Sequence, residues 1–106
     1  MPKYLIVANY SSSGAEGLLS AGGSSRRTAI TEMTEGLGGT LESFYFALGA
    51  DDAFVTVDLP DDEAAASVAL TVGAAGKASV RTITLLTPEQ VDEAAKRSPT
   101  YRAPGD

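Results

Sequence analysis

Three side chains that carry much of protein chemistry are missing, since the 106 residues contain no histidine, no cysteine and no tryptophan. Without cysteine there is no disulfide and no thiolate, which fits a cytoplasmic location. The usual zinc and haem ligands and the imidazole and thiolate nucleophiles are likewise excluded. Acid–base chemistry is left to Asp, Glu, Tyr and Lys, and neither a cofactor nor a metal is expected.

Basic residues are scarce as well, because eight Lys and Arg stand against fourteen Asp and Glu and give a net charge of −6. A surface of that sign repels phosphates, so neither nucleic acid nor an anionic membrane surface is an expected partner. No apolar run reaches the ~18 residues that span a bilayer. The residues Met1–Val7 lack the long apolar stretch of a secretory signal and are typical of a first strand.

The apolar pattern predicts four strands, over residues 4–10, 40–48, 53–59 and 79–86. Between the first two strands we expect two helical pieces, one through Leu18 and one from about Arg26, separated at Gly22-Gly23. A third helix follows Pro60 and ends at Gly73 and Gly76, and a fourth spans 88–97. Residues 1–97 are therefore expected to form one domain, and residues 98–106 an irregular tail.

Local signals give the helix ends. Ser13 with Glu16 matches a capping box for the first helix, and Thr87 with Gln90 matches one for the last, which also has Pro88 at its first position. In that last helix, Val91, Ala94 and Ala95 are expected to point inward. The acidic residues 61–63 suit the start of the third helix, so no bound cation is needed to explain them.

The order β-α-β-β-α-β plus a terminal helix predicts an α+β, ferredoxin-like fold, with helices on one face of the sheet. The other face needs a cover, because Phe44, Tyr45 and Phe46 are consecutive and must point to both faces. A second copy is the natural cover. We therefore expect a homodimer with two sheets packed face to face, a dimeric α+β barrel.

The chain resembles the GYD domain family over about residues 3–97. The stretches that carry the resemblance are Tyr4–Gly14, Leu37–Tyr45 with Gly49 and Asp52, Leu59–Ala66, and Val80–Leu85. The resemblance implies the same dimeric α+β barrel fold but no established chemistry. The family has Gly-x-Tyr-Asp at the hairpin turn, and here Asp51 stands where the tyrosine is expected.

Arg81 is the most informative residue, because the run Val80–Leu86 otherwise has the pattern of a buried strand. A cation there must be paired or must face a polar cavity. It could bind a carboxylate, phosphate or enolate. The alternative is a structural ion pair with an acidic residue such as Glu42 or Asp58 on a neighbouring strand.

The other candidate ligand-binding residues are Asn9, Tyr10, Tyr45 and Asp52. Asn9 and Tyr10 end the first strand, where turn hydrogen bonding and interface packing are the simpler explanations. Tyr45 could place a hydroxyl in the cavity or could be a core tyrosine, and Asp52 suits a hydrated turn. The pair Arg26-Arg27 at a helix start opposes the dipole, so an anion contact is weighed against a solvated pair.

Three functions agree with these features. The first is binding of a small anionic or carbonyl-containing molecule in a barrel pocket. The second is a cofactor-independent enzyme of the isomerase, cyclase or monooxygenase type, which depends on fold analogy alone. The third is a structural or partner-binding dimer without catalysis. A polar cavity that contains Arg81 would favour the first two.

Overall fold

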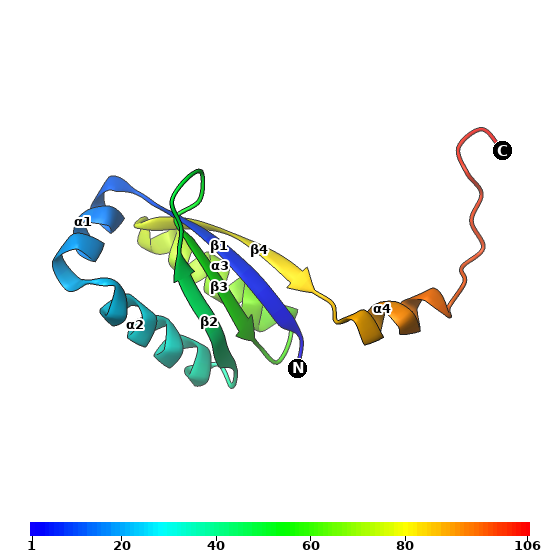
Figure 1. Cartoon of the computed structure of the whole chain (residues 1–106), viewed down its shortest axis with the longest axis horizontal. Helices are drawn as coiled ribbons and strands as arrows, with labels where there is room; N and C mark the ends of the chain where they lie inside the picture. Colours follow the sequence, from blue (N-terminus) through cyan, green and yellow to red (C-terminus); the bar gives the residue numbers. More distant parts are fainter.

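The computed structural model describes residues 1–106 as one four-stranded antiparallel sheet with helices packed on one face (Figure 1). The elements follow in the order β1 (Lys3–Tyr10), α1 (Ser12–Ala21), α2 (Gly23–Gly36), β2 (Thr40–Phe46), β3 (Ala53–Asp58), α3 (Asp62–Ala75), β4 (Ala78–Leu85) and α4 (Pro88–Ala95). The strand order is β2-β3-β1-β4. This confirms the α+β, ferredoxin-like prediction with a carboxy-terminal helix. No helix is both long enough and apolar enough to cross a membrane.

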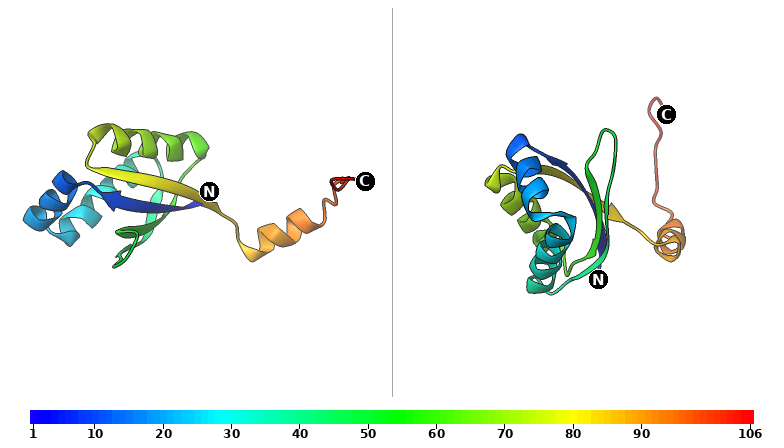
Figure 2. Two further views of the ribbon diagram at one scale, coloured as in Figure 1. Left: turned by 90° about the horizontal axis from the view of Figure 1, so that it is seen from above. Right: turned by 60° about the vertical axis from the view of Figure 1, so that its left-hand side comes forward.

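Strand register assigns each side chain to one face of the sheet. Val7 pairs with Phe54 on β3 and with Arg81 on β4, and Phe54 in turn pairs with Tyr45 on β2. This row lies on the face without helices, which we call the open face (Figure 2). Alternate residues face α1, α2 and α3. Phe44 therefore faces the helices while Tyr45 faces away, so the aromatic run of β2 does point to both faces.

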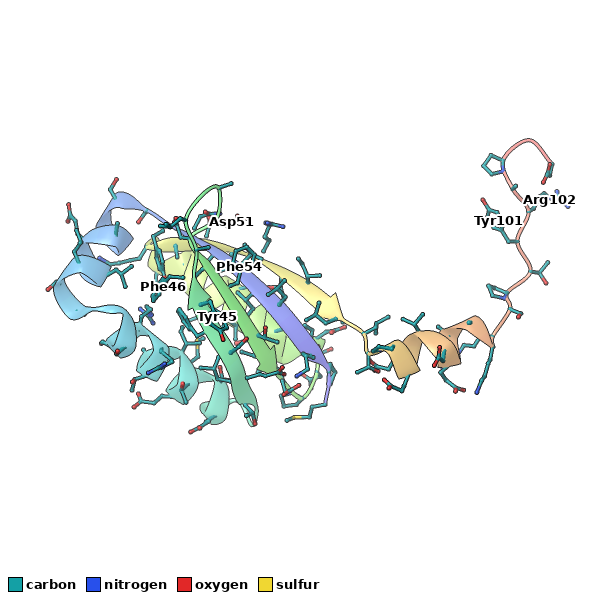
Figure 3. All side chains as sticks on the ribbon, in the orientation of Figure 1. Tyr45, Phe46, Asp51, Phe54, Tyr101 and Arg102 are labelled. Carbon is teal, nitrogen blue, oxygen red and sulfur yellow. The ribbon has the colours of Figure 1, made fainter.

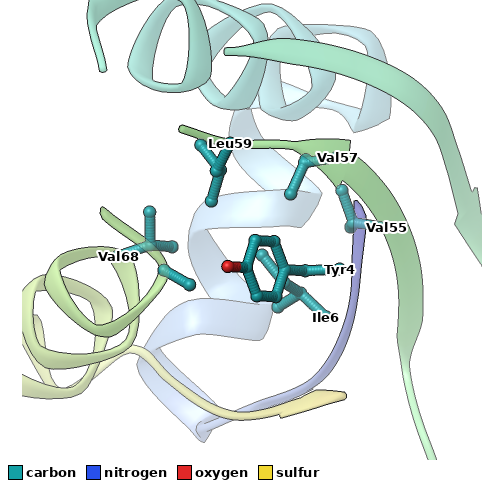
Figure 4. Close-up of a cluster of buried hydrophobic side chains, with 7 residues drawn as sticks. Tyr4, Ile6, Val55, Val57, Leu59 and Val68 are labelled. Carbon is teal, nitrogen blue, oxygen red and sulfur yellow. The ribbon is translucent and has the colours of Figure 1, made fainter. Parts of the chain in front are cut away.

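The core lies between the central strands and α3 (Figure 4). Its buried side chains come from β1, β3, the turn after β3, and α3: Tyr4, Ile6, Val55, Val57, Leu59, Ala65 and Val68. Tyr4 is only 1% exposed, and its hydroxyl donates to Asp62 Oδ1 at 2.6 Å. The ring thus fills the core while its polar end reaches the first turn of α3.

The first helix begins earlier than the capping pattern predicts. Ser11 is its N-cap and accepts a hydrogen bond from Gly14 N at 3.2 Å, so the box of Ser13 with Glu16 is wrong. Both serines suit an N-cap, and tertiary contact decides between them, because Ser11 also donates to the carbonyl of Lys77. The predicted break is present at Gly22, where φ is 87°. From there α2 begins at Gly23 rather than near Arg26.

The other helix ends agree closely with the sequence signals. Asp61 caps α3 by accepting from Ala64 N at 2.9 Å, and Gly76 ends it in the left-handed conformation. Gly73 does not end α3, since it lies inside the helix. The capping box of Thr87 with Gln90 is confirmed. The strands are slightly shorter than predicted at their carboxyl ends: β2 ends at Phe46 and β3 at Asp58.

The segment 86–106, which we call the arm, projects away from the rest of the chain (Figures 1 and 2). It consists of α4 and an irregular tail, and α4 contains no buried residue. The expectation that Val91, Ala94 and Ala95 point into their own core is wrong. The arm raises the radius of gyration to 16.9 Å, against about 13 Å for a compact chain of this length.

Candidate functional site

An apolar pocket of about 580 Å³ lies between the helix-covered face of the sheet and the three helices α1, α2 and α3. It lies where α2 packs against β2 and α3 packs against β4, over the inward side chains of the central strands. Sixteen of its 23 lining residues are hydrophobic. Ile6, Ala8 and Val55 come from the strands, and Ala29, Met33 and Val72 come from the helices. This volume is in the range of small-molecule sites.

The charged residues that line this pocket are all basic. Arg26 and Lys77 both line it, and no aspartate or glutamate does. This wall, with two basic residues and no carboxylate, contrasts with the chain as a whole, whose net charge is −6. Tyr10 and Ser25 add hydroxyl groups that can donate or accept hydrogen bonds. The lining thus suits a ligand that has an apolar body and one anionic or hydrogen-bond-accepting group.

Tyr10 is the predicted site residue that lies in this pocket. Partial burial raises the pKa of its phenol, the positive charge of Arg26 lowers it, and the carboxylate of Asp52 raises it. The net pKa shift is upward, so Tyr10 is neutral at physiological pH and can donate a hydrogen bond. Arg26 and Tyr10 both line the pocket.

Arg81 lies on the other face of the sheet, in a small polar cluster. Its Nη2 donates to Asp51 Oδ2 at 3.2 Å, and Asn9 Nδ2 donates to Asp51 Oδ1 at 3.2 Å. The carboxylate of Asp51, which lies in the loop between β2 and β3 (Figure 3), therefore connects this loop to β1 and β4. Asp51 Oδ2 accepts one hydrogen bond from Arg81, so most of the five guanidinium N–H donors of Arg81 have no partner within the chain.

Two expectations for Arg81 are wrong for the single chain. The strand β4 is an edge strand with many exposed residues, and the Arg81 side chain is 62% exposed. Its ion-pair partner is Asp51, not Glu42 or Asp58, both of which pair with Lys3 instead. The error has a physical cause: an apolar strand pattern shows that a strand is covered, but not whether its own chain supplies the cover.

The two remaining predicted residues, Tyr45 and Asp52, lie outside the pocket. Tyr45 lies on the open face and is 71% exposed, beside Phe54 (Figure 3). Asp52 belongs neither to the pocket nor to the cluster around Arg81. Its Oδ2 accepts a hydrogen bond from the backbone N of Tyr10 at 2.8 Å, and its own backbone N donates to the carbonyl oxygen of Ala8 at 2.9 Å. Asp52 therefore fixes the loop to the end of β1.

A family model described as the GYD domain matches residues 4–95. The chain belongs to the GYD domain family. The matched range contains all four helices and the whole sheet except Lys3, so the architecture described above is that of the GYD domain. No curated protein and no solved structure matches this GYD domain.

The apolar pocket of this GYD domain was not predicted from the sequence. The sequence offers the basic pair Arg26-Arg27 as a possible anion contact, and Arg26 does line the pocket. No sequence pattern indicates that Lys77 lines it as well. Lys77 stands in the turn between α3 and β4, and only the tertiary fold places it in the same pocket wall as Arg26. The small residues Gly14, Gly17 and Ala21 along one side of α1 are the pattern that leaves room for the cavity.

Proposed function

We propose that this GYD domain binds a small molecule with an apolar body and one anionic or carbonyl group, in the pocket between the sheet and helices α1, α2 and α3. The single observation that carries the proposal is the composition of the wall, which is apolar except for two cations and a few hydroxyls. Burial of the apolar body supplies affinity. Arg26, Lys77 and the neutral hydroxyl of Tyr10 would orient the polar group.

Decanoate and decanol are a suitable pair of probes, because they share one chain length and differ in the charge of the head group. Titration calorimetry should show that decanoate binds more tightly. Arg26→Gln and Lys77→Gln should each reduce that difference, and the double variant should remove it, because each substitution removes one of the two cations from the wall. Arg97→Gln is the matched control, since it makes the same charge change in the arm, outside the pocket.

A pocket-filling variant separates the cavity from the charges. Ala29→Trp introduces a large ring into the wall formed by α2 and should abolish binding of both probes. If decanoate and decanol bind equally and neither responds to Arg26→Gln or Ala29→Trp, the pocket is not a ligand site. Circular dichroism of each variant establishes that the fold is intact.

Catalysis in the same pocket would depend on Tyr10. With its pKa raised by burial, Tyr10 could serve as a general acid or as a hydrogen-bond donor to an enolate, but not as a base near neutral pH. Ligand binding needs no more than the groups that line the pocket, and for this reason we favour it over an isomerase, cyclase or monooxygenase activity.

We also propose that the GYD domain is a homodimer in which two open faces pack against each other. Support comes from the apolar side chains on that face, including Phe54, Tyr45 and Ile83, which the single chain leaves partly or largely exposed. The charged groups there already have partners within the chain: Lys3 pairs with Glu42 and Asp58, and Arg81 with Asp51. Stacking would therefore bury little unpaired charge.

In such a dimer the cluster of Asn9, Asp51 and Arg81 would be enclosed, and it is the second candidate ligand site. The observation in its favour is the set of guanidinium donors that Asp51 does not use. Arg81→Leu tests it. A ligand role predicts loss of anion binding with unchanged stability, whereas a structural pair predicts a lower midpoint of urea unfolding and unchanged binding. A dimer that binds no probe at either site would leave the purely structural role.

A further inference from the structure

The arm presents an amphipathic helix that its own chain does not cover. Val91, Ala94 and Ala95 are spaced three and four residues apart, so they share one side of α4. Val91 is 53% exposed, and Leu86, at the start of the arm, is 61% exposed. Acidic residues occupy other sides of the helix. The pattern is that of a helix with one buried side, but no surface of this chain meets it.

The helix is nevertheless strongly encoded in the sequence. Gln90 N donates to Thr87 Oγ1 at 3.1 Å, and Thr87 N donates to Gln90 Oε1 at 2.8 Å. Pro88 occupies the first helical position. A helix of eight residues is marginal in water by itself, because nucleation costs more than one or two turns return. The capping box lowers this cost, and packing against another surface would supply the rest of the stabilisation of α4.

We propose that the arm docks on a second copy of this chain, so that two arms are exchanged in the homodimer. The proposal depends on the face-to-face dimer proposed above. Its first support is placement: the arm leaves the sheet on the side opposite α1, α2 and α3, where the second sheet would lie (Figure 2, right). Two-fold symmetry would give each arm the same seat on its partner.

The path of the chain disfavours the alternative, in which the arm folds back on its own open face. Only Leu86 and Thr87 join β4 to α4. Thr87 precedes proline and is extended, with φ −73° and ψ 158°, a conformation that the proline ring favours at this position. The chain therefore continues outward from the strand instead of reversing over it.

The arms would add a substantial part of the contact between the two copies. Four strands 4.8 Å apart and about seven residues long give a projected footprint of roughly 450 Å² per subunit, or about 900 Å² for the pair. A helix about 12 Å long and 10 Å wide, seated on each partner, brings the projected total to roughly 1,400 Å². The two arms therefore extend the contact by about half of what the sheets alone provide.

Sedimentation equilibrium of full-length variants tests the arm separately from the sheet. Val91→Asp places a charge on the apolar side of α4 and should raise the dimer dissociation constant at least tenfold. Gln90→Glu is the matched control: it adds the same charge but preserves the capping box, and should change the constant less than threefold. Ile83→Asp tests the open face itself and should dissociate the dimer.

Amide hydrogen exchange of α4 supplies the second readout. Docking predicts that the α4 amides of the wild-type chain are protected at concentrations that favour the dimer and lose this protection on dilution. The arm proposal fails if Ile83→Asp dissociates the dimer while Val91→Asp leaves its affinity unchanged. It also fails if α4 is protected equally at all concentrations, which would mean that the arm binds its own chain. A wild-type chain that is monomeric throughout would refute the dimer itself, and the arm exchange with it.

Discussion

Gly14 allows α1 to lie directly against the start of β4, and its replacement gives a sharp test of the structure. A Cβ added to Gly14 would lie 2.0 Å from the carbonyl oxygen of Lys77, a distance that real Cβ atoms do not reach. The approach is fixed by hydrogen bonds, since Ser11 donates to that oxygen from its backbone N at 2.9 Å and from its hydroxyl at 3.1 Å. Gly14→Ala must therefore displace the whole start of α1.

Gly17 provides the matched control within the same helix. A Cβ added there would have no atom within 4 Å, so Gly17→Ala should stabilise the chain by about 0.5–1 kcal/mol through helix propensity. Gly14→Ala gains the same propensity but should lose about 1–3 kcal/mol to overpacking. We expect the two alanine variants to differ by about 2 kcal/mol, with Gly17→Ala the more stable.

Urea unfolding followed by far-ultraviolet circular dichroism measures this difference directly. In thermal unfolding, about 2 kcal/mol corresponds to a separation of roughly 10 °C in Tm for a domain of this size. Because Gly14 and Lys77 both line the pocket, Gly14→Ala should also weaken decanoate binding. A Gly14→Ala chain as stable as Gly17→Ala would show that α1 does not contact the Lys77 carbonyl as described.

Three further predictions follow from single contacts. The hydrogen bond to Asp62, together with burial and nearby carboxylates, raises the pKa of Tyr4 from 10.0 to about 12. The neutral Tyr4 hydroxyl therefore contributes its full stabilisation below pH 10, and this contribution is lost as the pH rises toward 12. In urea unfolding between pH 8 and pH 11, Tyr4→Phe should lose less stability with rising pH than the wild-type chain. Thr87→Ala removes the N-cap of α4 and should cost the helix about 1 kcal/mol, seen as faster amide exchange in α4 with unchanged exchange in the strands. Asp51→Ala breaks the pair with Arg81, whose side chains are 22% and 62% exposed in the single chain, and should lower the unfolding free energy by less than about 1 kcal/mol at concentrations where the chain is monomeric; the loss should be larger at concentrations that favour the proposed dimer, and an equal loss at both would contradict enclosure of the cluster.

The order of elements and most helix ends could be predicted from local chemistry. Thr87 and Gln90 form the predicted capping box, and Gly76 ends α3, because these signals act over three or four residues of contiguous chain. The competition between Ser11 and Ser13 could not be decided in this way. Both serines can cap a helix, and the contact of Ser11 with the Lys77 carbonyl, 66 residues away, favours Ser11.

The candidate site was far less accessible to sequence reasoning. Arg26 and Lys77 lie 51 positions apart, and only the packing of α1 and α2 beside α3 brings them to one cavity. Arg81 was expected among buried residues because its neighbours are apolar. Its exposure depends on the place of β4 at the sheet edge, a property of strand order that no local pattern records.

The sequence by itself determined the alternation of strands and helices, the sharp starts of α3 and α4, and the absence of thiol and imidazole chemistry, because each of these depends on residue identity and short spacing. Only the tertiary structure decided which faces of the sheet are covered, which basic residues line the pocket, and that the arm is not covered by its own chain. These properties are set by contacts between segments far apart in the chain, and hydrophobic periodicity shows that a side chain needs burial without showing what will bury it.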